Sequence, residues 1–151
     1  MISLDTNILF FSINRDAPSH ERAATFVHEI ATRRDIIISE LSLIELYRLL
    51  RNPAVLSKPL SAPEAVATVT TYRLHPFWKL TGFPEIGSAA IHDVLWQTAA
   101  MPGIAYRRIY DIRLALTLQH FGVTDFATAN TKDFEGLGFR RVWNPLADSA
   151  G

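Results

Sequence analysis

Ile36-Ile37-Ile38 is an uninterrupted run of β-branched apolar residues that lies between the polar residues Asp35 and Ser39. A strand with one face in water alternates apolar and polar residues, whereas a run without alternation is typical of a strand buried on both faces. Strands of that kind belong to parallel sheets with helices on both sides. This stretch therefore predicts an α/β fold.

A helix is expected on each side of this strand along the chain. The first spans about residues 17–32, where Phe26 and Ile30 belong to an apolar stripe at helical spacing. The second spans Ser39–Leu50, and Asn52-Pro53 ends it. Strand Ile36-Ile37-Ile38 is thus predicted to be flanked by helices, as a parallel sheet requires.

The rest of the chain continues the same alternation. Ile2-Ser3-Leu4 is expected to be a strand, and Ser61-Ala62-Pro63-Glu64 has the capping arrangement of a helix that continues to about Arg73. The other expected elements are a loop with room for one short strand over His75–Gly87, helices at about Ser88–Ala100 and Tyr106–Phe121, and strands over Asp125–Thr128 and Phe139–Val142. This order predicts a three-layer α/β/α sandwich with a mainly parallel central sheet.

Composition limits the class of protein. The 151 residues are 48% hydrophobic and 20% charged, which is globular and excludes a disordered or coiled-coil chain. No repeat or linker interrupts them, so residues 1–151 are predicted to form a single domain. The absence of cysteine excludes disulfides and zinc–thiolate sites. No signal-peptide pattern or membrane-length apolar run is present, and we expect a cytoplasmic protein.

The charge balance bears on the choice of ligand. Fifteen Lys and Arg residues match fifteen Asp and Glu residues, so the net charge is zero and general attraction to a polyanion is absent. A nucleic-acid partner would need local arginines or a bound metal. Only three of the fifteen cations are lysine, which leaves twelve arginines, the residue best suited to forked phosphate contacts.

Four acids lie where a parallel sheet gathers its functional groups. Asp5 follows the first strand, Glu45 lies in the helix after the second strand, Asp111 opens the helix before a late strand, and Asp133 follows that strand. Ligands of such sheets bind beyond the carboxyl ends of the strands, where these acids can converge. Clustered carboxylates need a cation, and Mg²⁺ or Mn²⁺ suits oxygen ligands. A carboxylate-held metal is an arrangement used for phosphodiester hydrolysis.

Each acid also has a purely structural interpretation. Asp5 can cap a turn, Glu45 can form a capping box with Ser42, and Asp111 can complement the helix dipole. Asp133 can cap a short turn, as can Asn130. Joint placement favours the site, because four independent caps have no reason to meet at one sheet edge.

Several segments in this order resemble the PIN-domain nucleases, and among them the VapC-type toxins. The resemblance rests on Ile2-Ser3-Leu4-Asp5-Thr6-Asn7-Ile8-Leu9, Ser42-Leu43-Ile44-Glu45-Leu46, Asp111-Ile112-Arg113-Leu114-Ala115-Leu116, and Ala127-Thr128-Ala129-Asn130-Thr131-Lys132-Asp133-Phe134 with Gly138-Phe139 and Asn144-Pro145. It covers nearly the whole chain. The resemblance implies a PIN-like fold and a metal-dependent endoribonuclease that acts as the toxin of a VapBC-type toxin–antitoxin pair.

The resemblance also implies roles for individual residues. Asp5, Glu45 and Asp111 are the expected metal-binding acids, with Asp133 or Asn130 completing the site. Many relatives carry Asp where this chain has Asn130. A neutral amide binds a second metal ion less well than a carboxylate does, so this difference argues against a two-metal site. The positions of Thr6 and Thr128 are similar to family positions that orient ligands or water.

Partners follow from the same resemblance: an RNA substrate, a homodimer and a VapB-like antitoxin whose C-terminal segment covers the acids. The candidate RNA contacts are Arg48, Arg51, Arg107, Arg108 and Arg113, for which a solvated charged face is the competing interpretation. The alternative function is a non-catalytic PIN-fold scaffold that binds RNA or protein.

Overall fold

A five-stranded parallel sheet forms the centre of the computed structural model, which describes residues 1–82 and 84–147. The strands are β1 (Ile2–Leu4), β2 (Ile36–Ser39), β3 (Lys79–Thr81), β4 (Asp125–Ala127) and β5 (Arg141–Trp143), in the order β3-β2-β1-β4-β5. Every pairing is parallel, and Ile2 of the central strand β1 lies opposite Ile36 on one side and Asp125 on the other. The predicted sheet is confirmed. Of the predicted domain, residue 83 and residues 148–151 lie outside the described residues.

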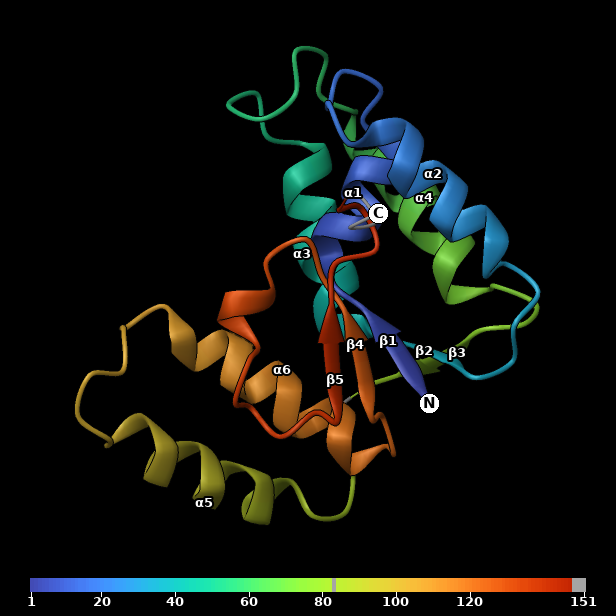
Figure 1. Ribbon diagram of the computed structural model, residues 1–151. Helices are drawn as coiled ribbons and strands as arrows, with labels where there is room; N and C mark the ends of the chain where they lie inside the picture. The colour runs from blue at the N-terminus through green and yellow to red at the C-terminus, as the bar shows by residue number, and fades with distance from the viewer. Residues whose placement is uncertain (83, 148–151) are drawn as a thin grey trace.

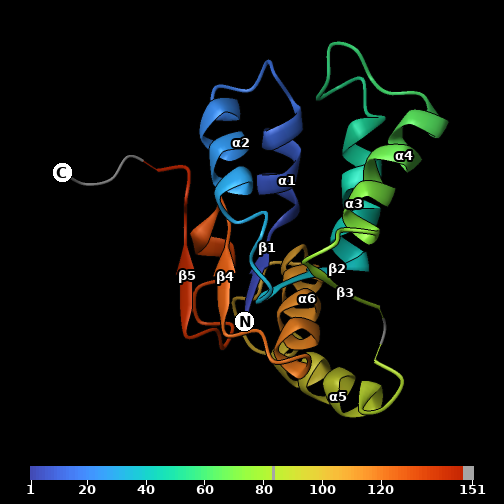
Figure 2. The same cartoon turned by 90° about the vertical axis from the view of Figure 1, so that its right-hand side faces the viewer.

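Helices cover both faces of the sheet. They are α1 (Thr6–Ile13), α2 (His20–Glu29), α3 (Glu40–Leu50), α4 (Ala62–Arg73), α5 (Ser88–Ala99) and α6 (Arg108–His120), with a 3₁₀ turn, η1, at Thr131–Asp133. Helices α1 to α4 gather on one side and α6, with α5 outside it, on the other (Figures 1 and 2). The expected three-layer α/β/α arrangement is therefore confirmed.

The position of strand β2 in the sheet explains why its residues do not alternate between apolar and polar. Ile36 and Ile38 are fully buried in the core beneath α1, α3 and α4, whereas Ile37 is 3% exposed in a second core with Phe126 and Leu118. Successive side chains of a strand point to opposite faces, so apolar residues are needed at every position when both faces are covered.

Helix α1 was not expected from the sequence, because residues Asp5 to Asn7 were interpreted only as a polar break after the first strand. Its apolar residues surround the helix instead of forming a stripe, and Ile8, Leu9 and Phe10 are all buried. A helix that is apolar all round has no 3.6-residue periodicity to detect.

Some predicted boundaries also change. Helix α2 begins at His20 and ends at Glu29, so it is shorter than the expected span of 17–32. Strand β5 begins at Arg141, two residues after the predicted start, because Phe139 packs in the loop with its ring stacked 5.0 Å from that of Phe126. The predicted capping box of α4 is confirmed: Ser61 N donates to Glu64 (2.8 Å), and Glu64 N donates to the Ser61 hydroxyl (3.3 Å).

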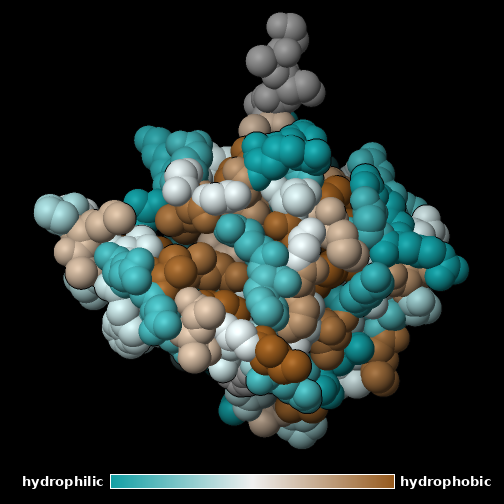
Figure 3. Space-filling view, turned by 90° about the horizontal axis from the view of Figure 1, so that it is seen from below, coloured by the Kyte–Doolittle hydropathy of each residue, from teal (hydrophilic) through white to brown (hydrophobic). Residues whose placement is uncertain are grey.

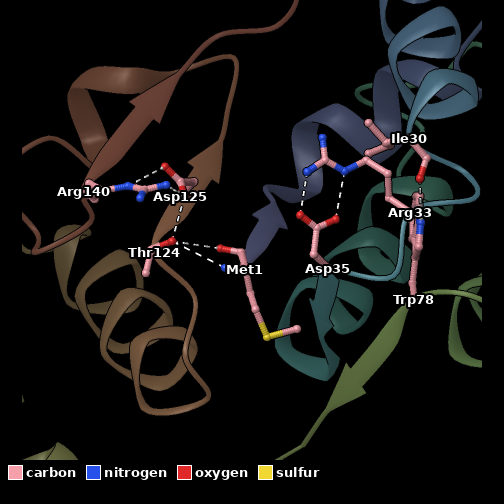
Figure 4. Close-up of polar contacts among 8 residues, drawn as sticks. All are labelled: Met1, Ile30, Arg33, Asp35, Trp78, Thr124, Asp125 and Arg140. Atoms are coloured by element: carbon pink, nitrogen blue, oxygen red, sulfur yellow. Dashed lines mark hydrogen bonds and ion pairs between the residues drawn. The ribbon is translucent and has the colours of Figure 1, made fainter.

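The short strand allowed for within His75–Gly87 is β3, at the sheet edge. Trp78, just before it, is 7% exposed, and its indole Nε1 donates to the carbonyl oxygen of Ile30 (3.2 Å; Figure 4). A buried indole needs such an acceptor, and this bond ties the start of β3 to the end of α2.

Acids at the amino ends of the strands are paired with arginines (Figure 4). Arg140 Nη2 lies 2.6 Å from Asp125, which begins β4, and Arg33 Nη2 lies 2.5 Å from Asp35. The Thr124 hydroxyl also donates to Asp125 (2.7 Å). The pKa of Asp125 is lowered, chiefly by this hydroxyl and by Arg140, so the carboxylate is already satisfied by protein donors.

Within the described residues, no helix is long and apolar enough to cross a membrane. Hydrophobic and polar residues alternate in patches on the face seen from below in Figure 3, the side on which α5 lies in Figure 1.

Candidate active site

A cavity of about 770 Å³ opens at the carboxyl end of β1 and is lined by residues of α3, α6 and the turn after β4. All four predicted acids line it: Asp5, Glu45, Asp111 and Asp133. They come from widely separated parts of the chain, and the parallel sheet brings them to one edge as expected from the sequence.

Asp5 lies at the junction of β1 and α1. It occupies the N-cap position of α1, but its side chain makes no capping bond, so a simple capping role is excluded. Its Oδ2 accepts a 2.7 Å hydrogen bond from the hydroxyl of Thr128 instead. Burial raises the pKa of Asp5 to about 6, with the charges of Glu45 and Asp111 adding to the effect and the Thr128 bond opposing it.

Asp111 is in the first turn of α6 and lines the same cavity as Asp5, on whose pKa its charge acts. Burial raises its pKa to about 6, and the negative charges of Asp133 and Glu45 contribute further, while Arg108 acts in the opposite direction. A position favourable to the helix dipole would lower a carboxyl pKa, so the neighbouring charges and burial prevail here.

Glu45 is on the face of α3 that borders the cavity. The capping box expected as its alternative role with Ser42 is not formed, because the N-cap of α3 is Ser39, whose hydroxyl accepts from Leu41 N (3.1 Å). The side chain of Glu45 is 52% exposed, and Arg48 Nη2 lies 3.7 Å from it. Glu45 is thus the most solvent-accessible acid of the four.

Asp133 ends the η1 turn, and the side-chain amide of Asn130 donates to its Oδ2. Asp133 lines the cavity, whereas Asn130 is not part of the described lining. The sequence left Asp133 and Asn130 as alternatives, and the structure distinguishes them. The carboxylate of Asp133 reaches the cavity, and the amide of Asn130 bonds to that carboxylate.

Two threonines connect the elements that carry the acids. Thr128 is fully buried, and besides donating to Asp5 its hydroxyl oxygen accepts from Asn130 N (3.0 Å). The hydroxyl of Thr6 donates to the carbonyl oxygen of Ser42 (3.1 Å), joining α1 to α3. Both threonines thus bond to groups of the elements that carry the acids, and the orienting role that the resemblance implied for them stays a prediction.

Asn7 also supports this region, although its sequence position did not predict a part in the site. Its Oδ1 accepts from Ala129 N (3.2 Å), and its Nδ2 donates to the hydroxyl oxygen of Thr128 (3.4 Å). Asn7 therefore ties α1 to the turn after β4. The available signal was a polar amide two residues after Asp5 at the start of an apolar segment.

The predicted RNA-contact arginines fall into two groups. Arg48, Arg107 and Arg113 line the cavity. Arg51 and Arg108 are outside its described lining. Arg51 lies over the ring of Tyr47, with the guanidinium carbon 5.7 Å from the ring centroid. Arg108 Nη2 donates to the carbonyl oxygens of Asp133 and Glu135 (3.3 Å each). Arg108 thus supports the acid-bearing turn.

The acids present a donor set suited to a hard divalent cation. All four donors are carboxylates. The pKa values of Asp5 and Asp111 are raised chiefly by burial and further by the neighbouring negative charges, and a bound cation would offset both effects. Among residues 1–82 and 84–147, no three acid or histidine side chains are already arranged as a metal-binding group. The acids surround the cavity and do not form a closed ligand shell.

Comparisons with known proteins show the family and the fold of the chain. The family model of the PIN domain matches residues 2–139. Ribonuclease VapC24 of Mycobacterium tuberculosis is 48% identical over 146 residues, which cover 97% of each chain. Two solved structures share the fold. One is M. tuberculosis VapC20, a sarcin-ricin loop cleaving toxin, with TM-score 0.61, 15% identity, and coverage of 83% of this chain and 87% of that one. The other is Rickettsia felis VapBC2 bound to a DNA fragment from its promoter, with TM-score 0.60, 18% identity, and coverage of 95% and 98%.

Proposed function

This chain belongs to the PIN-domain family, and from that premise we propose that it is a divalent-metal-dependent endoribonuclease, the toxin of a VapBC-type toxin–antitoxin pair. The observation that carries the proposal is the meeting of Asp5, Glu45, Asp111 and Asp133 around one cavity. Their placement is the one expected of a nuclease site, and the 48% identical relative is named a ribonuclease. A pure binding scaffold has no need of mutually repelling carboxylates, so that alternative is not favoured.

We assign the metal to the two acids with raised pKa values, Asp5 and Asp111, with Asp133 completing the acidic pocket. Mg²⁺ or Mn²⁺ fits these oxygen donors. When bound, such an ion supplies positive charge to phosphate oxygens and makes water more acidic.

Glu45 has a different role in the proposed reaction. Its exposed carboxylate at the cavity wall can bind a water and accept its proton as that water attacks phosphorus. The P–O3′ bond breaks on the side opposite the attack, and the departing O3′ takes up a proton from solvent water. The products carry 5′-phosphate and 3′-hydroxyl ends, as the family likeness implies. Thr128 holds Asp5 in position, and Asn130 holds Asp133.

The partners in this proposal are an RNA substrate, a second copy of the chain and a VapB-like antitoxin. One relative by fold, VapBC2, was solved as a complex on promoter DNA. An acidic cavity is suited to an arginine side chain from an inhibitor, because a guanidinium forms forked bonds with carboxylates and replaces the positive charge of the metal.

The test is cleavage of RNA by the purified protein with and without a chelator. Asp5→Asn and Asp111→Asn are expected to abolish cleavage, while Asp35→Asn, at the opposite edge of the sheet, retains it. Undiminished cleavage in either site variant contradicts the assignment. Millimolar titration of Mg²⁺ or Mn²⁺ by calorimetry separates the nuclease from the scaffold, which is expected to bind neither ion.

A further inference from the structure

Helices α3 and α6 present matching surfaces to the cavity. Each places an acid there, Glu45 or Asp111, and immediately before it a large apolar side chain that is exposed to solvent. Ile44 is 61% exposed and Tyr110 is 74% exposed, and both line the cavity. Apolar groups beside charged ones at the mouth of a cavity do not contribute to a core, so they point to a ligand with an apolar part.

Tyr110 differs from the other three tyrosines of the chain. Arg51 lies over the ring of Tyr47, Tyr72 stacks on Trp78, and Arg107 lies over the ring of Tyr106. Within the described residues, the ring of Tyr110 has no stacking or cation–π contact, and its hydroxyl has no hydrogen bond. Its exposed ring face is therefore available to a planar ligand.

The position of Tyr110 on α6 relates that ring to the reacting phosphate. Arg107, Tyr110, Asp111 and Leu114 are spaced three or four residues apart, so they share one face of the helix and all line the cavity. A cation-binding acid therefore has an aromatic ring on one side and a guanidinium one turn away. This combination matches a nucleotide, which joins a planar base to a phosphate.

We propose that Tyr110 and Ile44 are specificity-determining residues that bind one RNA base next to the scissile phosphate, with that base stacked on the ring of Tyr110 and packed against Ile44. The inference rests on the proposed ribonuclease function and names the part of the substrate that the cavity recognises. RNA-binding proteins commonly stack splayed-out bases on aromatic rings, and a base paired in a helix is not available for such stacking. The cavity volume of about 770 Å³ lies within the range of about 300–1,000 Å³ typical of small-ligand sites.

The experiment compares cleavage of one RNA with that of a matched RNA lacking a single base. The cut site of a single-stranded RNA is mapped by end sequencing, and abasic versions are made at each nucleotide flanking the cut. The enzymes are wild type, Tyr110→Ala, Tyr110→Phe and Ile44→Ala. Trp96→Ala is the matched control, because Trp96 is 61% exposed on α5 and outside the described lining of the cavity. Thermal unfolding checks that every variant is folded.

The expected result is a fall in kcat/KM of roughly 5- to 150-fold for Tyr110→Ala on intact RNA, with a smaller fall for Ile44→Ala. Tyr110→Phe and Trp96→Ala keep wild-type rates. One abasic RNA slows the wild type by a similar factor but slows Tyr110→Ala no further, because the same contact is already lost.

Three outcomes overturn the inference. Wild-type rates for Tyr110→Ala show that the ring does not contact substrate, and equal further loss on every abasic RNA shows that it does not contact a base. If Tyr110→Ala cleaves normally but resists inhibition by the antitoxin, the surface is a protein contact. Failure of the wild type to cleave any RNA with divalent metal instead refutes the proposed function itself, which the first two outcomes leave intact.

Discussion

Thr128 donates a 2.7 Å hydrogen bond from its hydroxyl to Oδ2 of Asp5, which links residues at the ends of two adjacent parallel strands. Thr128 is fully buried, so its hydroxyl has no competing contact with water. The bond points the carboxylate of Asp5 into the cavity and partly offsets the rise in its pKa caused by burial. A short polar side chain thereby controls both the direction and the charge of a proposed metal ligand.

Thr128→Val is expected to weaken divalent-ion binding by roughly 10- to 100-fold, because groups that orient a metal ligand commonly contribute that much. Without the hydroxyl, the pKa of Asp5 rises further and the ion competes with a proton over a wider pH range. Calorimetric titration with Mn²⁺ measures the loss. Thr128→Ser keeps the hydroxyl and is expected to bind nearly as well as wild type, and equal weakening in both variants would contradict this role.

The pKa values of Asp5 and Asp111, both about 6, predict that divalent-ion binding weakens as the pH falls below about 6. Metal binding requires carboxylates, and below this pH each proton must be displaced by the ion. Mn²⁺ titrations at a series of pH values between about 5 and 8 measure the dependence. In Asp111→Asn one of these groups is removed, so its residual binding is expected to depend less steeply on pH, and an unchanged slope is evidence against Asp111.

Asp5→Asn is expected to stabilise the ion-free fold at neutral pH. The folded-state pKa of Asp5 is raised from 3.8 to about 6, so the wild type loses stability as the pH rises through this window and the uncharged amide does not. The gain is roughly 1–3 kcal/mol above about pH 6, at about 1.4 kcal/mol per unit of pKa, and it disappears below about pH 4. Urea unfolding in chelator at both pH values measures it.

Asp35→Asn is the matched control for this stability test. The pKa of Asp35 is lowered, chiefly by its hydrogen bond with Arg33, so this carboxylate stabilises the fold above its ordinary pKa and its removal yields no gain. Saturating Mn²⁺ is expected to reverse the order, since the ion stabilises only a chain that binds it. A gain for Asp5→Asn that persists at low pH would show that charge is not its cause.

Arg108→Gln is expected to reduce cleavage roughly tenfold or more. The guanidinium donates to the carbonyl oxygens of Asp133 and Glu135, and bonds from a charged donor contribute about 1.5–3 kcal/mol. Faster hydrogen exchange at backbone amides of residues 133–135 is expected together with the loss of activity. Arg108→Lys retains the charge but not the forked geometry, so an intermediate rate shows that both matter.

Arg51→Gln is the control for this prediction. Arg51 contacts Tyr47 and lies outside the described lining of the cavity, although the sequence placed it with Arg108 among the RNA-contact candidates. Its loss is expected to leave kcat/KM and exchange in the turn unchanged. An equal effect of both variants would indicate a general dependence on positive charge and contradict a specific role for Arg108.

Local sequence patterns were sufficient to predict a helix or strand where the pattern lies within that one element. The run Ile36-Ile37-Ile38 predicted a strand covered on both faces, and the Ser61–Glu64 capping box placed the start of α4. The apparent box of Ser42 and Glu45 was wrong because the strand ends at Ser39, which takes the cap position itself. Helix α1 was missed because it is apolar on every side.

For the candidate site too, the sequence predicted some features, and others could be seen only in the folded structure. Sequence order placed Asp5 and Asp133 after strands, and Glu45 and Asp111 in helices that connect strands. The parallel connections were enough to predict that the four acids meet. The roles of Asn7, Arg108 and Tyr110 depend on which side chains reach them from distant segments, and no spacing along the chain encodes those contacts.

The amino-acid sequence by itself therefore determined the layers of this protein and the edge at which its acids gather, because periodicity, caps and strand order act within or between neighbouring elements. Only the tertiary structure decided which carboxylates are buried, which arginines reach the cavity and which tyrosine is left with an open face. Those properties arise from the packing of α3 and α6 against the sheet, since burial and contact depend on atoms brought together by the whole fold.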